Sequence, residues 1–325
     1  NCLLNFGEED GAIGYRVGAA GEGLRIMFHM MNEARIRVGL GATTLGWAGY
    51  EASLDYARTR RQGRHTGSGG KEAAAAQVPI IEHADVKRML LAQKAYVEGS
   101  LALQLYCARL IDEQSTGDAD QRRNAALLLA VLTPIAKSFR SEWCLEANNL
   151  AIQVHGGYGY TRDFPVEQHW RDNRLNLIHE GTHGIQGLDL LGRKVVMQEG
   201  AAFDLLLARM DETIGLALQT PETAGQARQL AEARHRLKAV TRSIGGSVEA
   251  LANATLYLQV FGHLVVAWIW LDMTRALGSR TDAFAVGKRA AAKYFFTYEL
   301  PRIDAWLKVV ADRETLCLDT TAEIF

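Results

Sequence analysis

The hexapeptide HEGTHG at residues 179–184 has the residue types and spacing of the zinc peptidase motif H-E-x-x-H. In that motif two histidines one helical turn apart bind zinc, and the glutamate between them polarises a zinc-bound water. A helix over this stretch would contain two glycines, each costing about 1 kcal/mol relative to alanine. The sequence therefore also fits a loop that leads into a helix, with Thr182 as the N-cap residue.

A zinc site at this hexapeptide would also need a third ligand. Gln186 stands where the longer motif H-E-x-x-H-x-x-G requires glycine. Glu199 could serve as the third ligand only if one helix ran unbroken from the motif to that residue. We therefore expect no metal here, and a zinc hydrolase stays as the remote alternative.

The elements that must position this hexapeptide are helices. The 325 residues include five prolines, and long stretches have apolar residues at helical spacing. We expect helices over about 23–62, 81–113, 121–155, 166–171 and 184–198, a connector over 64–79, and three or four further amphipathic helices within 201–325 with breaks at 220–223, 278–282 and near Pro301. The predicted fold class is all-α: a four-helix bundle followed by a second helical module.

Composition excludes several classes of function. With 36 basic and 37 acidic residues the net charge is −1, which predicts no nucleic-acid partner. Four widely spaced cysteines favour reduced thiols in the cytoplasm over a disulfide framework. The apolar stretch 256–273 is interrupted by Gln259, His263 and Asp272, so we expect a buried core helix there and no membrane span.

The first residues resemble the continuation of something upstream. The segment LNFGEEDGAIGYRVG reads as a strand and a turn, and no initiator methionine precedes it. We expect the chain to be a fragment that lacks its N-terminal part.

A family resemblance extends from residue 1 to about residue 198. The segment QVHGGYGYTRDFPVEQHWRDNRLNLIHEGTHGIQGLDLLGRKV, residues 153–195, resembles the C-terminal domain of acyl-CoA dehydrogenases, whose pattern runs Q-x-x-G-G-x-G-[YF], [FY]-P-V-E, R-D and E-G-T. Residues 201–325 resemble the extra helical module of a bacterial subgroup of long members. The resemblance implies three parts: the end of a middle β-domain at 1–20, the helical bundle at 21–200 and the extra module at 201–325.

The resemblance also implies an activity. These flavoenzymes oxidise acyl-CoA thioesters to 2,3-enoyl-CoA, and the glutamate of E-G-T takes the α-proton while a hydride passes to N5 of FAD. Glu180 corresponds to that base. Some members carry the base on the first bundle helix instead, at the position of Ala34, which has no ionisable group.

Binding residues follow from the same resemblance. On the cofactor side, a neighbouring subunit's FAD is expected to contact Arg60, Gln62, Gln153, Gly156 and Gly157, and the chain's own flavin to contact Thr182. On the substrate side we expect Asn32, Arg35 and Gly181. Gly63 occupies a position where relatives usually have an aromatic residue.

Partners are implied in the same way: an acyl-CoA substrate, electron-transferring flavoprotein as the electron acceptor, and a second copy of the chain in a homodimer. The isolated chain, without the β-domain that holds most of the flavin, is expected to be inactive. A catalytically silent helical module used for assembly is the alternative description of that isolated chain.

Overall fold

The computed structural model describes residues 2–65 and 76–325, without the side chains at positions 28 and 29. Within these ranges the chain is helical and forms no β-strand, apart from one isolated bridge between Arg61 and Pro79. The predicted all-α class is confirmed. The α-helices are α1 Gly23–Thr59, α2 Ala84–Thr116, α3 Ala119–His155, α4 Val166–Arg174, α5 His183–Asp189, α6 Ala201–Leu218, α7 Pro221–Ile244, α8 Val248–Ala252, α9 Ala254–Ala276, α10 Ala283–Tyr294, α11 Ile303–Asp312 and α12 Leu316–Asp319.

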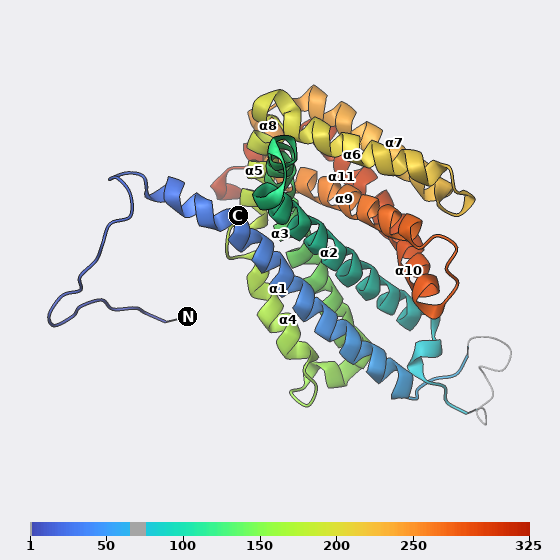
Figure 1. Cartoon of the computed structure of the whole chain (residues 1–325). Coiled ribbons are helices and arrows are strands. Elements are labelled where there is room, and N and C mark those ends of the chain that lie inside the picture. The colour runs from blue at the N-terminus through green and yellow to red at the C-terminus, as the bar shows by residue number, and fades with distance from the viewer. Residues whose placement is uncertain (1, 66–75) are drawn as a thin grey trace.

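The long helices α1, α2 and α3 lie side by side, and the shorter α4 packs against α1 and α3 to complete the bundle (Figure 1). Glycines on one face of α1 bring it close to α3. A Cβ atom at Gly39 would lie 2.4 Å from the carbonyl oxygen of Ala136, and one at Gly49 would lie 2.4 Å from Nδ2 of Asn148. Larger residues at these two positions would therefore force α1 away from α3.

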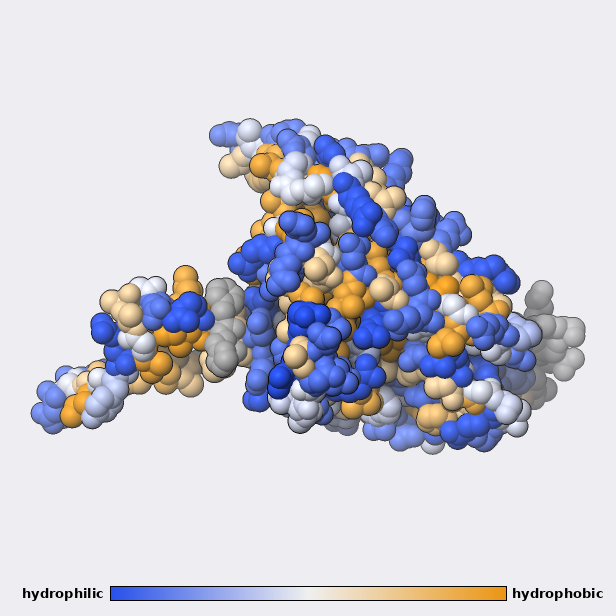
Figure 2. Space-filling view, turned by 45° about the horizontal axis from the view of Figure 1, so that its top comes forward, coloured by the Kyte–Doolittle hydropathy of each residue, from blue (hydrophilic) through white to orange (hydrophobic). Residues whose placement is uncertain are grey.

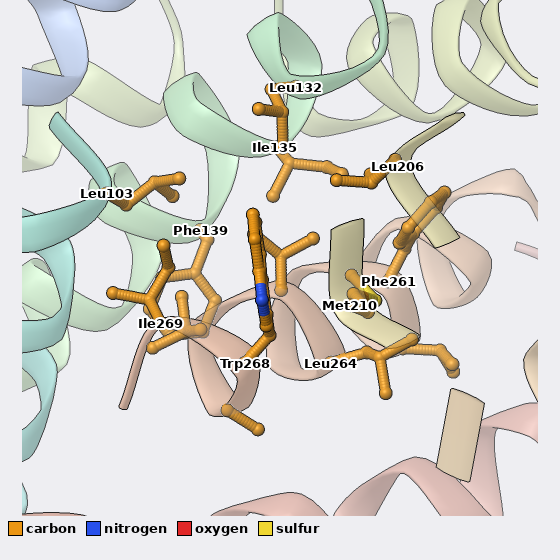
Figure 3. Close-up of a cluster of buried hydrophobic side chains, with 14 of the residues drawn as sticks. Leu103, Leu132, Ile135, Phe139, Leu206, Met210, Phe261, Leu264, Trp268 and Ile269 are labelled. Carbon is orange, nitrogen blue, oxygen red and sulfur yellow. The ribbon is translucent and has the colours of Figure 1, made fainter. Parts of the chain in front are cut away.

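The second helical module packs on the bundle through one continuous apolar core. Trp268 of α9 stands at the centre of this core, and its indole N–H donates to the Thr213 hydroxyl at 2.8 Å. Figure 3 shows the side chains of α2, α3 and α6 that surround this tryptophan: Leu103, Leu132, Ile135, Phe139, Leu206 and Met210. The module and the bundle therefore share one core, which couples the stability of the two parts.

Helix α9 covers the apolar stretch 256–273. It is the one helix of the described chain that is long and apolar enough to cross a membrane, but 83% of its most apolar 18-residue window is buried inside the protein. It packs against α3, α5, α7 and α11. This burial agrees with the expected core helix.

Several predicted boundaries are wrong. A single helix over 184–198 is not formed: α5 ends at Asp189, a π-helix covers Leu190–Lys194, and Gln198 and Glu199 are left-handed, with φ of 49° and 58°. The module at 201–325 contains seven α-helices in place of three or four. The additional break between α7 and α8 falls at Gly245, whose φ is +58°.

Residues 2–20 project from the bundle ahead of α1 as exposed chain (Figure 1). A turn at residues 8–10 is present, but the expected strand is not formed in this segment. Its exposed apolar side chains are Leu3, Leu4, Phe6, Ile13, Tyr15 and Val17, and Figure 2 shows apolar surface on the projecting arm. The assignment of residues 1–20 to a β-domain stays a prediction, because a strand needs a partner strand to complete its hydrogen bonds. The connector predicted over 64–79 lies largely outside the described residues.

Candidate functional site

Glu180 sits in a tight turn between two helical segments. A 3₁₀ turn, Leu175–Leu177, precedes it and α5 follows, beginning at His183. Glu180 and Gly181 both have left-handed backbones, with φ of 55° and 93°. This conformation is costly for a residue with a side chain, and it is typically retained where surrounding contacts enforce it.

The turn rules out the helix on which a zinc peptidase motif depends. His179 lies in the turn and His183 is the first residue of α5, so the two histidines are not successive turns of one helix. Thr182 occupies the N-cap position as predicted, although its side chain accepts no capping hydrogen bond within the described chain. In the described ranges no three His, Cys, Asp or Glu side chains are grouped so as to hold a metal ion.

Two buried side chains hold this turn. Lys137 of α3 is completely buried, and its Nζ donates a 2.8 Å hydrogen bond to the carbonyl oxygen of Gly181. Gln186 of α5 is also completely buried, and its Nε2 donates to the carbonyl oxygen of Glu180 at 2.9 Å. These bonds connect α3 and α5 to the peptide units on either side of Gly181. They supply the contacts that keep Glu180 in its left-handed conformation.

The carboxylate of Glu180 lies in a positively charged neighbourhood. The pKa of Lys137 is lowered to about 8, chiefly by burial and also by the charge of Arg35, while the attraction of Glu180 partly opposes both effects. Glu180 itself is half-buried. Its backbone N–H has no hydrogen-bond acceptor among the described residues. A ligand carbonyl can therefore accept from that N–H, next to an available carboxylate.

The predicted substrate residues Asn32 and Arg35 line one cavity of about 360 Å³. The Arg35 guanidinium is buried and donates to Asp189 Oδ2 at 3.2 Å. Arg193 donates to the other oxygen of Asp189 at 2.6 Å from NH2 and 2.9 Å from Nε. Lys194 also lines the cavity, which is therefore rich in positive charge. Sequence reasoning missed Asp189, Arg193 and Lys194.

His183 is packed against the same loop. Its side chain is 17% exposed, and burial lowers its pKa to about 4, helped by the charges of Lys137 and Arg174. Glu142 Oε2 lies 3.9 Å from Nδ1, beyond hydrogen-bond distance, and that carboxylate already accepts from Gln259. Neither ring nitrogen has a hydrogen-bond partner in the described chain. The imidazole is therefore neutral near pH 7.

A second group of predicted residues meets at the far end of α1. A cavity of about 390 Å³ is lined by Arg60, Gln62, Gln153 and Gly156, all four predicted to contact FAD. Gly157 follows them on the exposed surface. The Nε atom of Arg60 is buried without a hydrogen-bond partner in the described chain. A forked donor with one unsatisfied N–H, beside a glycine of positive φ, fits the phosphates of a dinucleotide.

His83 was missed by sequence reasoning, and it lines this same cavity. Its Nε2 lies 2.8 Å from the carbonyl oxygen of Gln62. Its ring also fills the space beside Gly63, because a Cβ atom at that glycine would lie 3.0 Å from Nε2. The ring of His83, the N-cap residue of α2, thus lies next to the position where the family resemblance predicts an aromatic residue.

The Arg35 cavity and the Arg60 cavity lie at different places along α1. Arg35 lies within α1 and Arg60 directly follows its last residue. At 1.5 Å per residue, the 25 intervening steps span about 37 Å. The cavity lined by Asn32 and Arg35 and the cavity lined by the Arg60 group are therefore separate sites on the chain.

Comparison with known proteins identifies the family. Residues 21–195 match the family model described as acyl-CoA dehydrogenase, C-terminal domain, and residues 206–321 match the one described as acetyl-CoA dehydrogenase C-terminal like. The chain therefore belongs to the acyl-CoA dehydrogenase family.

Among individual relatives, the chain is 36% identical over 268 residues to 3-methylmercaptopropionyl-CoA dehydrogenase of Ruegeria pomeroyi, covering 80% of the chain and 45% of that protein. Two solved structures share its fold. Caenorhabditis elegans ACDH-11, in complex with C11-CoA, has a TM-score of 0.77 at 20% identity over 96% of the chain and 51% of its own. The Bacillus anthracis acyl-CoA dehydrogenase with FAD has a TM-score of 0.72 at 19% identity over 94% and 52%. The chain thus spans about half the length of these relatives.

Proposed function

We propose that the chain is the C-terminal half of an FAD-dependent acyl-CoA dehydrogenase, with Glu180 as the catalytic base. The observation that carries this proposal is the turn at Glu180. A glutamate is held there in a costly left-handed conformation by Lys137 and Gln186, and its N–H is available to a ligand. Structural strain of this kind gathers at functional sites, because other contacts must compensate for its free-energy cost.

In the proposed reaction the thioester carbonyl accepts a hydrogen bond from the Glu180 N–H, which stabilises negative charge as it develops on that oxygen. The Glu180 carboxylate then takes the proton from the α-carbon. The electron pair of that C–H bond forms the new double bond between the α- and β-carbons. FAD, held in part by Thr182, would supply the acceptor for the β-hydrogen and its electron pair and would leave as reduced flavin. The products are the 2,3-enoyl-CoA and a protonated Glu180.

Arg35 supports the acyl-CoA end of this site. Its guanidinium is fixed by Asp189, and the cavity it lines with Asn32 carries further positive charge from Arg193 and Lys194. A phosphate-bearing thioester such as acyl-CoA suits that charge. Gly181, which follows the base, allows a ligand to approach the backbone closely.

The proposed assembly is a homodimer in which the Arg60 cavity contacts the cofactor of the partner chain and Thr182 contacts the chain's own flavin. The residues proposed for the partner's cofactor are Arg60, Gln62, Gln153, Gly156 and Gly157. The orphaned Nε of Arg60 is the observation that favours this arrangement. Electron-transferring flavoprotein is the proposed electron acceptor. The proposed location is the cytoplasm, which suits the four unpaired cysteines.

The experiment is Glu180→Gln in the complete enzyme. Turnover with an artificial electron acceptor should fall at least about 1,000-fold, because glutamine cannot take a proton, while flavin absorbance stays stoichiometric. Glu199→Gln is the matched control, because Glu199 shares the left-handed backbone of Glu180 but is exposed and lies outside the turn. Turnover in Glu180→Gln equal to that of the control would remove Glu180 from the mechanism.

For the chain by itself, a catalytically silent assembly module is a second candidate. The row of exposed apolar side chains in residues 2–17 favours it, because such a surface is normally covered by a partner. A flavin spectrum of the purified chain distinguishes the two. Stoichiometric absorbance near the flavin bands supports an assembled cofactor site, and its absence supports the silent module.

A further inference from the structure

Helix α5, which directly follows the candidate active-site turn, is not held by apolar side chains of its own. Its two large apolar side chains, Ile185 and Leu188, are 52% and 44% exposed. Its buried residues are Gln186, Gly187 and Asp189. A short helix normally owes its stability to an apolar face packed against the core. The position of α5 therefore depends on the specific contacts of its three buried residues.

Each of these three residues contacts a different part of the chain. Gln186 donates to the carbonyl oxygen of Glu180 in the turn at 2.9 Å. Asp189 accepts from Arg35 of α1 at 3.2 Å. Gly187 lies against the second helical module, at the first residue of α9. Helix α5 thus joins the turn, the substrate cavity and the module.

The contact between α5 and the module is made by backbone atoms. A Cβ atom at Gly187 would lie 2.6 Å from the carbonyl oxygen of Ala254, 2.7 Å from its carbonyl carbon and 3.0 Å from the backbone nitrogen of Thr255. No side-chain rotation can move these atoms away. Helix α5 also packs more extensively against α9 than against α3. The start of α9 therefore sets the position of α5 and of the turn that α5 holds.

The start of α9 is itself fixed within the module. Asn253, the residue before Ala254, donates from Nδ2 to the carbonyl oxygen of Glu249 at 3.0 Å and to that of Glu314 at 2.8 Å. These bonds connect α8, the start of α9 and the segment that follows α11. They hold Ala254 in a defined place against Gly187.

We propose that the second helical module positions the catalytic base: α9 fixes α5 through the contact of Ala254 with Gly187, and α5 fixes the turn through Gln186. This inference rests on the proposed role of Glu180. It gives the module a function beyond assembly, because the geometry of the turn then depends on how the module packs.

The test is Gly187→Ala in the complete FAD-loaded enzyme. To bring the new Cβ atom from 2.6 Å to the 3.4 Å of an ordinary contact, α5 and α9 must separate by about 0.8 Å. A displacement of that size should lower kcat, measured with an artificial electron acceptor, by about 10- to 100-fold. The KM for acyl-CoA should change less than kcat, because Arg35 lies on α1, which the substitution does not touch.

The second readout does not depend on activity. Hydrogen exchange of the backbone amides of residues 180–190, followed by mass spectrometry in the same enzyme, should become about tenfold faster in Gly187→Ala. The reason is that the turn and α5 lose the contact that holds them closed.

Gly99→Ala is the matched control. Gly99 of α2 also lies against α9, where a Cβ atom would stand 2.7 Å from Nε1 of Trp270 and 2.9 Å from Cγ1 of Val266. Val266 is about 18 Å further along α9 than Ala254, at 1.5 Å per residue. This variant should lose stability but keep the wild-type kcat and the wild-type exchange of residues 180–190.

Asn253→Ala carries the test from the module side where Gly187→Ala does not yield folded flavoprotein. It removes both side-chain hydrogen bonds at the start of α9 and leaves the sequence of α5 unchanged. It should lower kcat by at least about threefold and make the exchange of the same amides faster.

A wild-type kcat in Gly187→Ala, or in Asn253→Ala where that variant is used, would overturn the inference, whatever the exchange shows. So would equal changes in Gly187→Ala and Gly99→Ala, because a general loss of stability does not distinguish the two contacts. Glu180→Gln in parallel separates the two proposals. If that variant turns over normally, the role of the base fails, while faster exchange confined to Gly187→Ala still supports the hold of the module on the turn.

Discussion

Replacing His183 with phenylalanine is expected to remove a pH dependence of folding stability between pH 4 and 6.5. His183 has a folded-state pKa of about 4, against 6.5 for an exposed histidine, because its ring is buried beside Lys137 and Arg174. In this window the unfolded chain binds a proton at His183 and the folded chain does not. Stability therefore falls as the pH falls from 6.5 to 4.

The magnitude follows from the two pKa values. Their difference, from 6.5 to about 4, corresponds to about 3 kcal/mol in the free energy of unfolding, or about 1.4 kcal/mol per pH unit across the window. Glu142 has the opposite effect on how stability depends on pH. Burial raises its pKa, so the folded state holds its proton more tightly than the unfolded state does. Glu142 is present in both proteins, so the difference between wild type and His183→Phe isolates the histidine.

The assay is urea unfolding of the 325-residue chain at pH 4.5, 5.5, 6.5 and 7.5, followed by circular dichroism. The free energy of unfolding of the wild type, relative to that of His183→Phe, should fall by about 2–3 kcal/mol from pH 7.5 to 4.5. His179→Phe is the control, because His179 is exposed on the same turn and should leave the slope unchanged. Equal slopes for wild type and His183→Phe would refute the assignment of a buried, neutral imidazole.

Three further outcomes are expected. Gly187→Ala should lower the free energy of unfolding by about 1–3 kcal/mol, measured by urea unfolding, because its Cβ would lie 2.6 Å from the Ala254 carbonyl oxygen. The control Gly184→Ala places its Cβ in open space, so it should be neutral or slightly stabilising. Elemental analysis of the purified chain should find no stoichiometric zinc, because residues 179–184 are not expected to bind it. Stoichiometric zinc whose removal by a chelator also abolishes a hydrolase activity would contradict this. The purified chain should be a dimer by light scattering and should carry no bound flavin. A clean monomer would contradict the dimer, and a stoichiometric yellow chromophore after gel filtration would contradict the absence of flavin.

The long helices could be predicted because their signals are local. Scarce proline and regular apolar spacing placed α1 and α3 within about three residues of their observed ends. The start of α3 also has a local cause, a capping box in which Asp118 accepts from the Gln121 N–H and the Gln121 side chain accepts from the Asp118 N–H. Signals of this kind depend on neighbours within one or two helical turns.

The end of α5 could not be predicted in this way. The apolar pattern from 184 to 198 continues at helical spacing, but the helix widens into a π-turn after Asp189 and stops before Gln198. Asp189 is tied to Arg35 across the bundle, 154 residues away in sequence. A contact at that separation is set by tertiary packing, which overrides the local preference.

In the candidate site, too, the residues in short local patterns could be predicted, and those placed by long-range packing could not. Glu180 and the Arg60 group stand in short patterns, and the structure brings Arg60, Gln62, Gln153 and Gly156 together at one cavity. Lys137 has no motif. Its one sequence signal is a lysine within the otherwise apolar run LTPIAKSF, where a charge predicts burial with a partner but does not identify the partner.

Of the two buried basic groups beside the turn, Lys137 keeps its proton and His183 does not. Lys137 and His183 repel each other's protons, so the site cannot easily hold both positive charges. Lys137 keeps its proton at lower cost because it also gains the Gly181 carbonyl and the attraction of Glu180, whereas neither nitrogen of His183 has a hydrogen-bond partner in the described chain. The proton therefore stays on the lysine. Near pH 7 the turn is therefore packed against an ammonium at Lys137 and a neutral imidazole at His183.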